Sequence, residues 1–230
     1  MTTAGSALPP SGNRATDDGN RVADDDVLRR LRTETAAEHQ AVENSLDLLS
    51  PRLTRARLVD VLTRMHGFWL AAESGLDGWA RARPADAAGV DWPRRRRARL
   101  FAGDLTALGA APAADRPALP DVPDTDAALG RLYVLEGSSL GGVFIDRHLA
   151  TLPQLAGAGR LSCFSPYGER TGAMWHAFRT VTRARVAAGG DAGRLVDSAR
   201  QTFGALASWC GAPTPGSGGP PPRRSGSPDD

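Results

Sequence analysis

The sequence predicts an all-α fold in which several helices pack into a bundle. Apolar residues recur at steps of three and four along long segments, and this spacing places them on one face of a helix. No segment alternates apolar and polar residues in the way that a half-buried strand does. Capping residues and prolines stand where several of the apolar stripes begin and end. We therefore expect helices joined by loops and no sheet.

The first two helices illustrate this pattern. An apolar stripe over residues 28–49 follows the acidic run 24–26, whose charge favours a helix N-terminus, and Pro51 ends the helix. A second stripe covers residues 58–79 and follows Thr54, a candidate N-cap. Each stripe is long enough to bury one side of its helix against the rest of the bundle.

Four more helices are expected, over residues 93–108, 125–149, 171–188 and 192–209. Four consecutive arginines at 94–97 lie in the first of these, and we interpret them as a solvated helix face or helix start. Together the helices are expected to form one domain, residues 25–210. Residues 1–24 and 211–230 are rich in small and polar residues and lack periodicity, which is typical of disordered tails.

Charge and cysteine content exclude several classes of protein. The 28 basic residues are all arginine and are nearly balanced by 26 acidic ones, so we expect no nucleic-acid partner. No signal-peptide pattern and no long apolar span is visible, and we expect no membrane attachment. Cys163 and Cys210 have no metal-ligand spacing and make no disulfide framework, which favours a cytoplasmic protein.

The segment 135–142, Leu-Glu-Gly-Ser-Ser-Leu-Gly-Gly, is the least usual part of a predicted helix. Each glycine inside a helix costs about 1 kcal/mol relative to alanine. Gly137 and Gly141 share a helix face, and Gly142 widens the bare patch. Such a face admits either a neighbouring helix or a flat apolar ligand, above which the hydroxyls of Ser138 and Ser139 could hold water. No nucleotide-binding glycine motif and no serine-hydrolase elbow occurs.

Four histidines occur, and His39 is notable because it lies on the apolar stripe of the first predicted helix. A histidine there is more often a core residue than a ligand, but a neutral imidazole facing an apolar pocket also suits a haem iron. For His66 and His148 we expect surface or capping roles, and for His176 a packing role. Their spacing does not suit zinc.

Taken together, these segments resemble the bacterial haem oxygenases, particularly the biliverdin-producing enzymes associated with bacteriophytochromes. The resemblance covers about residues 27–209. Three blocks carry it: Leu-Arg-Thr-Glu-Thr-Ala-Ala-Glu-His at 31–39, Leu-Tyr-Val-Leu-Glu-Gly-Ser-Ser-Leu-Gly-Gly at 132–142 with Arg-His-Leu at 147–149, and Tyr167-Gly168 with Trp175 and Phe178.

The resemblance implies a bundle in which haem lies between the first helix and a kinked, glycine-rich distal helix. His39 would be the iron ligand, and the distal wall would be formed by Gly137, Ser138, Gly141 and Gly142. The implied reaction is oxygen-dependent cleavage of haem to biliverdin, with release of carbon monoxide and iron. Haem would be both substrate and cofactor, a ferredoxin or reductase would supply electrons, and a bacteriophytochrome would be a candidate recipient of biliverdin.

Further residues are candidates for contact with such a haem. Arg32 lies seven residues before His39 on the same helix face, and it could pair with a propionate or remain solvated. Arg179 is a second candidate cation. Tyr133 could reach a propionate or pack in the core, and Phe203 could touch the haem edge or pack.

Two positions depart from the family pattern. Animal-type members place a water-ordering aspartate where this chain has Ser138, and Val143 stands where a polar residue is common. A second interpretation is therefore a carrier or sensor of the same fold that binds haem without degrading it. A third is an enzyme of the wider superfamily that acts on a thiamine-like substrate, which would need a nucleophilic cysteine in the pocket.

Overall fold

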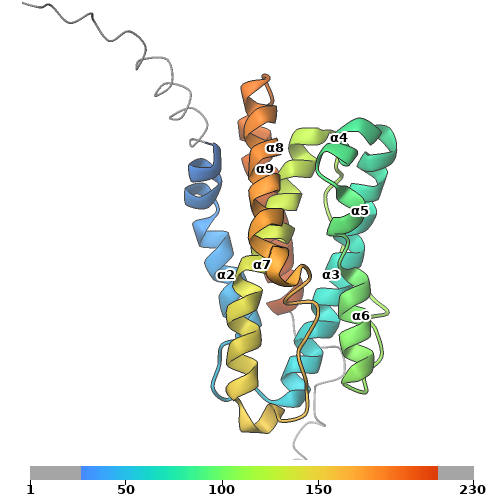
Figure 1. The fold of residues 1–230 in the computed structure, drawn as a ribbon, viewed down its shortest axis with the longest axis vertical. Coiled ribbons are helices and arrows are strands. Elements are labelled where there is room, and N and C mark those ends of the chain that lie inside the picture. Colours follow the sequence, from blue (N-terminus) through green and yellow to red (C-terminus); the bar gives the residue numbers. More distant parts are fainter. Residues whose placement is uncertain (1–26, 212–230) are drawn as a thin grey trace, which may run out of the picture.

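Helices dominate the part of the chain that the computed structural model describes, residues 27–211 (Figure 1). No residue in that range forms a strand, so the predicted all-α class is confirmed. The two predicted tails lie outside the described residues, except for Gly211, which ends the last helix. None of the described helices combines the length and the apolar character needed to cross a bilayer.

The first predicted helix is present as two helical stretches that meet at Thr35. Residues 27–34 are helical, and α2 covers Ala36–Leu46. The backbone keeps helical hydrogen bonds across the junction, since the Thr35 amide donates to the Leu31 carbonyl at 3.1 Å and the His39 amide donates to the Thr35 carbonyl at 2.9 Å. The Thr35 hydroxyl also donates to the Leu31 carbonyl, at 2.7 Å, and thereby competes with the backbone bond.

The second predicted helix is α3, Arg55–Ala82, and its predicted cap is confirmed. The hydroxyl of Thr54 accepts a hydrogen bond from the amide of Arg57 at 3.2 Å. The end of the preceding helix was predicted too late, because Asp47 adopts a left-handed conformation and closes α2. Leu49 is consequently 58% exposed instead of continuing the buried stripe.

The helix predicted over residues 93–108 is interrupted. Glu73 of α3 accepts hydrogen bonds from the amides of Arg97 and Ala98, at 2.6 and 2.7 Å, and so caps a new helix N-terminus at this point. The chain between residues 84 and 107 therefore forms three short helices: α4 (Pro84–Gly89), α5 (Trp92–Arg95) and α6 (Ala98–Ala107).

The remaining predicted helices are present as α7 (Thr125–Thr151), α8 (Thr171–Ala187) and α9 (Ala192–Gly211). Two single turns, η1 (Pro153–Leu155) and η2 (Gly168–Arg170), interrupt the segment between α7 and α8. The Asp124 side chain caps α7 by accepting from the amide of Ala127 at 2.9 Å. The glycine-bearing segment is helical throughout, and the kink that the resemblance implies stays a prediction.

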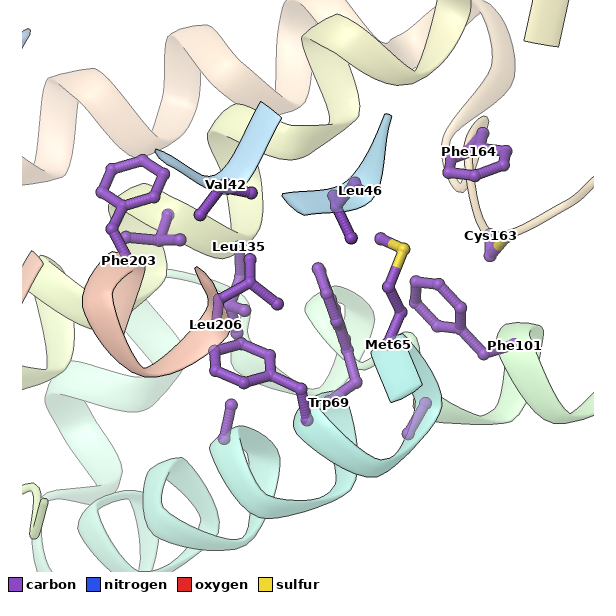
Figure 2. Close-up of a cluster of buried hydrophobic side chains, with 14 of the residues drawn as sticks. Val42, Leu46, Met65, Trp69, Phe101, Leu135, Cys163, Phe164, Phe203 and Leu206 are labelled. Carbon is purple, nitrogen blue, oxygen red and sulfur yellow. The ribbon is translucent and has the colours of Figure 1, made fainter. Parts of the chain in front are cut away.

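Helix α7 is the centre of the bundle. It packs most extensively against α9 and also contacts α8 and α3, while α2 packs against α9. In Figure 1, α2 lies on one side of the molecule and α3 with α6 on the other, and α7 runs between them. Figure 2 shows the core side chains of these elements converging: Val42 and Leu46 from α2, Met65 and Trp69 from α3, Leu135 from α7, and Phe203 and Leu206 from α9.

Candidate functional site

A pocket of about 970 Å³ is lined by residues of α2, α3, α7, α8 and α9. Its volume is at the upper end of the roughly 300–1,000 Å³ typical of small-molecule and cofactor sites. Most of the site residues predicted from the sequence line this one pocket, although they come from distant parts of the chain. They are Arg32, His39, Tyr133, Gly137, Ser138, Gly141, Arg179 and Phe203.

His39 lies at the open side of the pocket, with its side chain 55% exposed. It is therefore not a core residue, which was the ordinary alternative for this position. The Glu43 carboxylate, one turn further along α2, lies 3.7 Å from the Nδ1 atom of His39. The Phe203 ring contacts the imidazole edge-to-face, with ring centroids 5.4 Å apart.

The glycines of the predicted bare patch separate into two groups. A Cβ atom on Gly137 or Gly141 would meet nothing within 4 Å, and both residues line the pocket. A Cβ atom on Gly142 would lie 2.0 Å from the carbonyl oxygen of Phe164. The structure thus places Gly142 against a neighbouring backbone and not on the pocket wall where we expected it, while Gly137 and Gly141 leave an open face.

Only one of the two serines beside these glycines reaches the pocket. The hydroxyl of Ser138 donates to the Leu135 carbonyl at 2.7 Å and accepts from the Nη1 atom of Arg97 at 2.9 Å. Ser139 is buried on another side of α7, where its hydroxyl donates to the Glu136 carbonyl at 2.6 Å. Of the two hydroxyls that were expected at the pocket, only that of Ser138 is found there.

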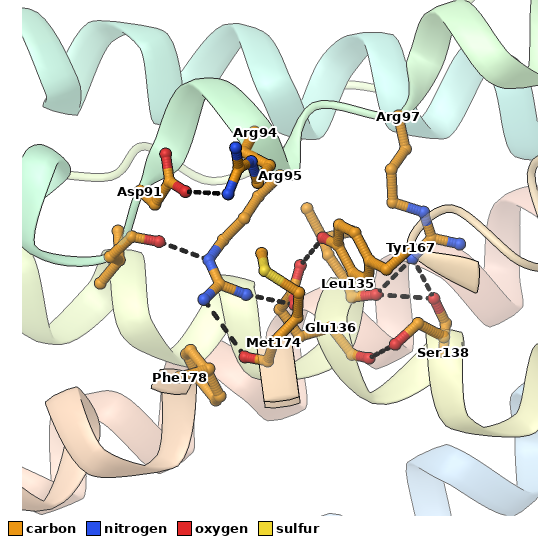
Figure 3. Close-up of polar contacts among 12 residues, drawn as sticks. Asp91, Arg94, Arg95, Arg97, Leu135, Glu136, Ser138, Tyr167, Met174 and Phe178 are labelled. Carbon is orange, nitrogen blue, oxygen red and sulfur yellow. Dashed lines mark hydrogen bonds and ion pairs between the residues drawn. The ribbon is translucent and has the colours of Figure 1, made fainter. Parts of the chain in front are cut away.

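Arg97 is a pocket residue that the sequence interpretation missed. The arginine run was expected to be solvated, but Arg95 and Arg97 are only 2% and 1% exposed. Besides its bond to Ser138, Arg97 donates to the carbonyl oxygen of Leu135 at 2.7 Å (Figure 3). It also donates to the carbonyl oxygen of Cys163, at 2.7 Å. Burial lowers the pKa of the Arg97 guanidinium. The four consecutive arginines are identical in the sequence, so the sequence does not show which side chains are buried. Their burial depends on the break between α5 and α6.

A buried charge cluster lies next to the glycine face, on the side of α7 away from the pocket. Arg95 pairs with Glu136, which is 1% exposed, and the Tyr167 hydroxyl donates to the same carboxylate at 2.6 Å (Figure 3). Burial raises the pKa of Glu136, and the charge of Arg95 opposes that rise. Arg95 also donates to the Met174 carbonyl at 3.3 Å. These bonds fasten α7 to α5 and to α8 directly beside Gly137.

Aromatic rings cover another side of the pocket. Tyr133 contacts Trp175 and Phe203 at centroid distances of 5.9 and 6.4 Å, and Trp175 stacks on Phe178 at 5.5 Å. Burial raises the pKa of Tyr133, which therefore stays a neutral phenol at physiological pH. The pocket consequently combines a bare glycine face with flat aromatic walls, which suits a flat apolar ligand.

Besides Arg97, four more arginines line the pocket: Arg29, Arg32, Arg179 and Arg183. The Nε atom of Arg179 is buried and has no hydrogen-bond partner among the described residues. An unpartnered buried donor is rare in a folded protein. Guanidinium groups at the edge of an apolar pocket fit a ligand that carries carboxylates.

Neither cysteine lines the pocket, and both are buried. Burial raises the pKa of the Cys210 thiol to about 12 and that of Cys163 well above its ordinary value. Thiols of this kind are weak nucleophiles, so the interpretation as an enzyme with a pocket cysteine has no support.

The other three histidines lie outside the pocket lining. A surface or capping role was expected for His66. It is 5% exposed and so not at the surface, and its Nδ1 atom accepts from the backbone amide of Ala113 at 2.9 Å. His148 lies near the end of α7, with Nε2 3.3 Å from the Ser50 carbonyl, in keeping with a capping role. His176 is exposed on α8, so the packing role expected for it is wrong.

Comparison with known proteins identifies the fold. No protein-family model and no curated protein matches the chain. A crystal structure of the haem oxygenase from Neisseria meningitidis, in NO- and CO-bound forms, matches with a TM-score of 0.62 and 23% sequence identity. The match covers 80% of this chain and 89% of the Neisseria chain. The chain has the haem oxygenase fold. At this identity the likeness shows the fold alone, and the chemistry has to be argued from the residues of the pocket.

Proposed function

We propose that this chain binds haem in the pocket and cleaves it with oxygen to biliverdin, releasing carbon monoxide and iron. One observation carries the proposal: a single pocket brings together His39 from α2 and the open glycine face of Gly137 and Gly141 from α7. An imidazole can bind the haem iron, and a helix face without side chains lets a flat macrocycle lie close to the backbone.

The rest of the pocket supports the same ligand. The rings of Tyr133 and Phe203 offer apolar contacts for the macrocycle. Arg32 and Arg179 are the cations proposed for the two propionates, and Arg179 brings a buried donor that still lacks a partner. The bare face of α7 would limit where a small molecule can lie beside the macrocycle, and Gly137 and Gly141 would thereby influence which ring edge reacts.

The reaction needs electrons from outside the chain, and we propose a ferredoxin or a reductase as their source. We place the reaction in the cytoplasm, and a bacteriophytochrome is the proposed recipient of biliverdin. These assignments follow from the resemblance described above. They would be tested by reconstituting the reaction with a purified ferredoxin system in place of a chemical reductant.

The experiment that tests the proposed function is a haem titration of the purified protein, followed by reductant and air with catalase present. We expect one haem per chain and then the absorbance spectrum of biliverdin. His39→Ala should abolish the axial-ligand spectrum of the ferric complex. His176→Ala is the matched control, because His176 is exposed and lies off the pocket. An unchanged spectrum in His39→Ala would contradict the assignment of the iron ligand.

One observation favours a second candidate, a carrier that binds haem without degrading it. The Ser138 hydroxyl already gives its proton to the Leu135 carbonyl and accepts from Arg97. It therefore cannot act as a free acid towards a ligand without rearranging. A stable oxygen complex with no ring opening in the same experiment would favour the carrier over the oxygenase.

A further inference from the structure

The charge of Arg97 is buried without an ion pair. None of the described residues places a carboxylate within 4.0 Å of its guanidinium, and its three hydrogen bonds go to neutral acceptors, two carbonyls and one hydroxyl. Its Nε–H group is buried and has no partner there. Arg95, equally buried two residues earlier, is paired with Glu136. Burial lowers the pKa of the guanidinium and outweighs the carboxylates of Glu136 and Glu73, which favour the charged form of Arg97. A buried charge with no contacting ion pair is costly, and on a pocket wall a bound ligand can stabilise it.

A second unpartnered donor belongs to the aromatic ring that this guanidinium contacts. Trp69 is completely buried on α3 and lines the pocket, and its indole N–H has no hydrogen-bond partner among the described residues. The central carbon of the Arg97 guanidinium lies over the Trp69 ring, 5.3 Å from the centroid. Figure 2 shows the Trp69 side chain extending from α3 toward α2. By contrast, the indole N–H of Trp79, also buried on α3, donates to Thr125 at 3.2 Å.

The surroundings of Arg97 hold it in place. Glu73 accepts from the Arg97 backbone amide at 2.6 Å, while Ser138 and the carbonyl of Leu135 bind the Nη1 atom and the carbonyl of Cys163 binds Nη2. The guanidinium is therefore preorganised, and a ligand that uses it need not order a flexible side chain first.

We propose that Arg97 and Trp69 form an electropositive donor pair on the wall of the pocket, which binds a small anion or hydrogen-bond-accepting ligand of the bound haem. Ser138 acts as a positioning residue that fixes the guanidinium. This inference rests on the proposed haem binding and deepens it. In this proposal the Arg97 charge and the Trp69 indole N–H select among small ligands. The Ser138 hydroxyl does not, because it is already hydrogen-bonded to Leu135 and Arg97.

The test uses the full chain loaded with ferric haem and titrated with sodium fluoride, followed by absorbance. Fluoride is a strong hydrogen-bond acceptor, so its affinity reports on nearby donors. Trp69→Phe keeps an aromatic ring but removes the N–H group, and we expect fluoride to bind about 3- to 10-fold more weakly. Arg97→Met should weaken it by about 10- to 100-fold, and Arg97→Lys should recover part of the loss. Trp79→Phe, the matched control, should leave the fluoride affinity unchanged.

A second ligand separates this role from a general disturbance of the pocket. Carbon monoxide accepts hydrogen bonds poorly, so the ferrous Trp69→Phe protein should bind it as the wild type does. Equal fluoride affinity in wild type and Trp69→Phe, or equal losses for fluoride and carbon monoxide, would overturn the donor-pair proposal while leaving haem binding intact. Failure of the wild-type chain to bind haem at all would overturn this proposal together with the proposed function.

Discussion

The two halves of α7 have opposite environments. In the N-terminal half, residues 125–136, every side chain except Tyr133 is buried. In the C-terminal half, residues 137–151, only Ser139, Gly142 and Leu149 are buried. A helix that is covered on all sides is held by its neighbours, whereas a helix that is open on one side is free to form the wall of a pocket. One helix thus serves both as the central support of the bundle and as the wall of the site.

The glycines of α7 show what this difference means. Gly130, in the buried half, would bring a Cβ atom to 2.2 Å from the Leu195 carbonyl of α9. Gly137 and Gly141, in the open half, would meet nothing within 4 Å. Packing against α9 therefore explains why residue 130 is glycine, but no packing contact explains the glycines at 137 and 141. A glycine inside a helix costs about 1 kcal/mol relative to alanine. The proposed function accounts for the second pair by a ligand that needs the space.

The largest effect is expected from Gly130→Ala. The new methyl group would collide with backbone atoms of Leu195 and Ala199, which cannot move without shifting α9. We expect the free energy of unfolding to fall by about 3 kcal/mol, measured by urea denaturation. Gly103→Ala in α6 is the control, since a Cβ atom there would meet nothing within 4 Å. Comparable stability in the two variants would mean that α7 and α9 are not in close contact at this point.

A smaller effect is expected at the start of the buried half. Asp126 is 5% exposed and accepts from Arg185 Nε at 2.6 Å, from Arg185 Nη2 at 3.1 Å and from the Asp191 amide at 3.0 Å. Burial alone would raise the pKa of Asp126, but these bonds outweigh it and the pKa is lowered. The ionised carboxylate therefore stabilises the fold above its unfolded pKa of about 3.9, and that contribution is lost as the pH falls through the lower, folded value.

We accordingly expect Asp126→Asn to reduce the free energy of unfolding by about 2 kcal/mol at pH 7. The difference from the wild type should shrink as the pH is lowered below about 4. Glu169→Gln, which changes an exposed carboxylate on η2, should have little effect. A difference between Asp126→Asn and wild type that stays constant down to low pH would contradict the role of the ionised group.

The elements that could be predicted from the sequence are those whose signals are local. The stripe of α3 and the Thr54 cap depend on spacing and on one hydroxyl, and both are confirmed. The resemblance predicted that His39 lies near the glycine-bearing helix, and residues of both line one pocket, whereas the role of His39 as a ligand stays a prediction. Leu49 shows the limit of periodicity, because an apolar residue at the right step can still lie beyond the end of its helix.

The features that could not be predicted depend on contacts between distant segments. The inward turn of Arg97 is set by a cap from Glu73, which lies 24 residues earlier in the chain. Gly142 and Gly141 are neighbours in the sequence, but only Gly142 meets the Phe164 backbone. The spacing of glycines shows which of them share a face and does not show what lies against that face.

We expect the smallest change in stability from Gly137→Ala in the open half of α7. This variant tests the difference between the two halves most directly. Without haem, the variant should gain about 0.5–1 kcal/mol, because alanine suits a helix better and its methyl group has room. With haem, the same methyl group would occupy the bare face, so haem affinity or the rate of biliverdin formation should fall. Gly172→Ala in α8, also with nothing within 4 Å of its Cβ position but outside the pocket lining, should leave haem binding unchanged. If Gly137→Ala were more stable but still bound and cleaved haem as the wild type does, haem would not lie against the open face of α7. The ligand of His39 would then have to occupy another part of the pocket.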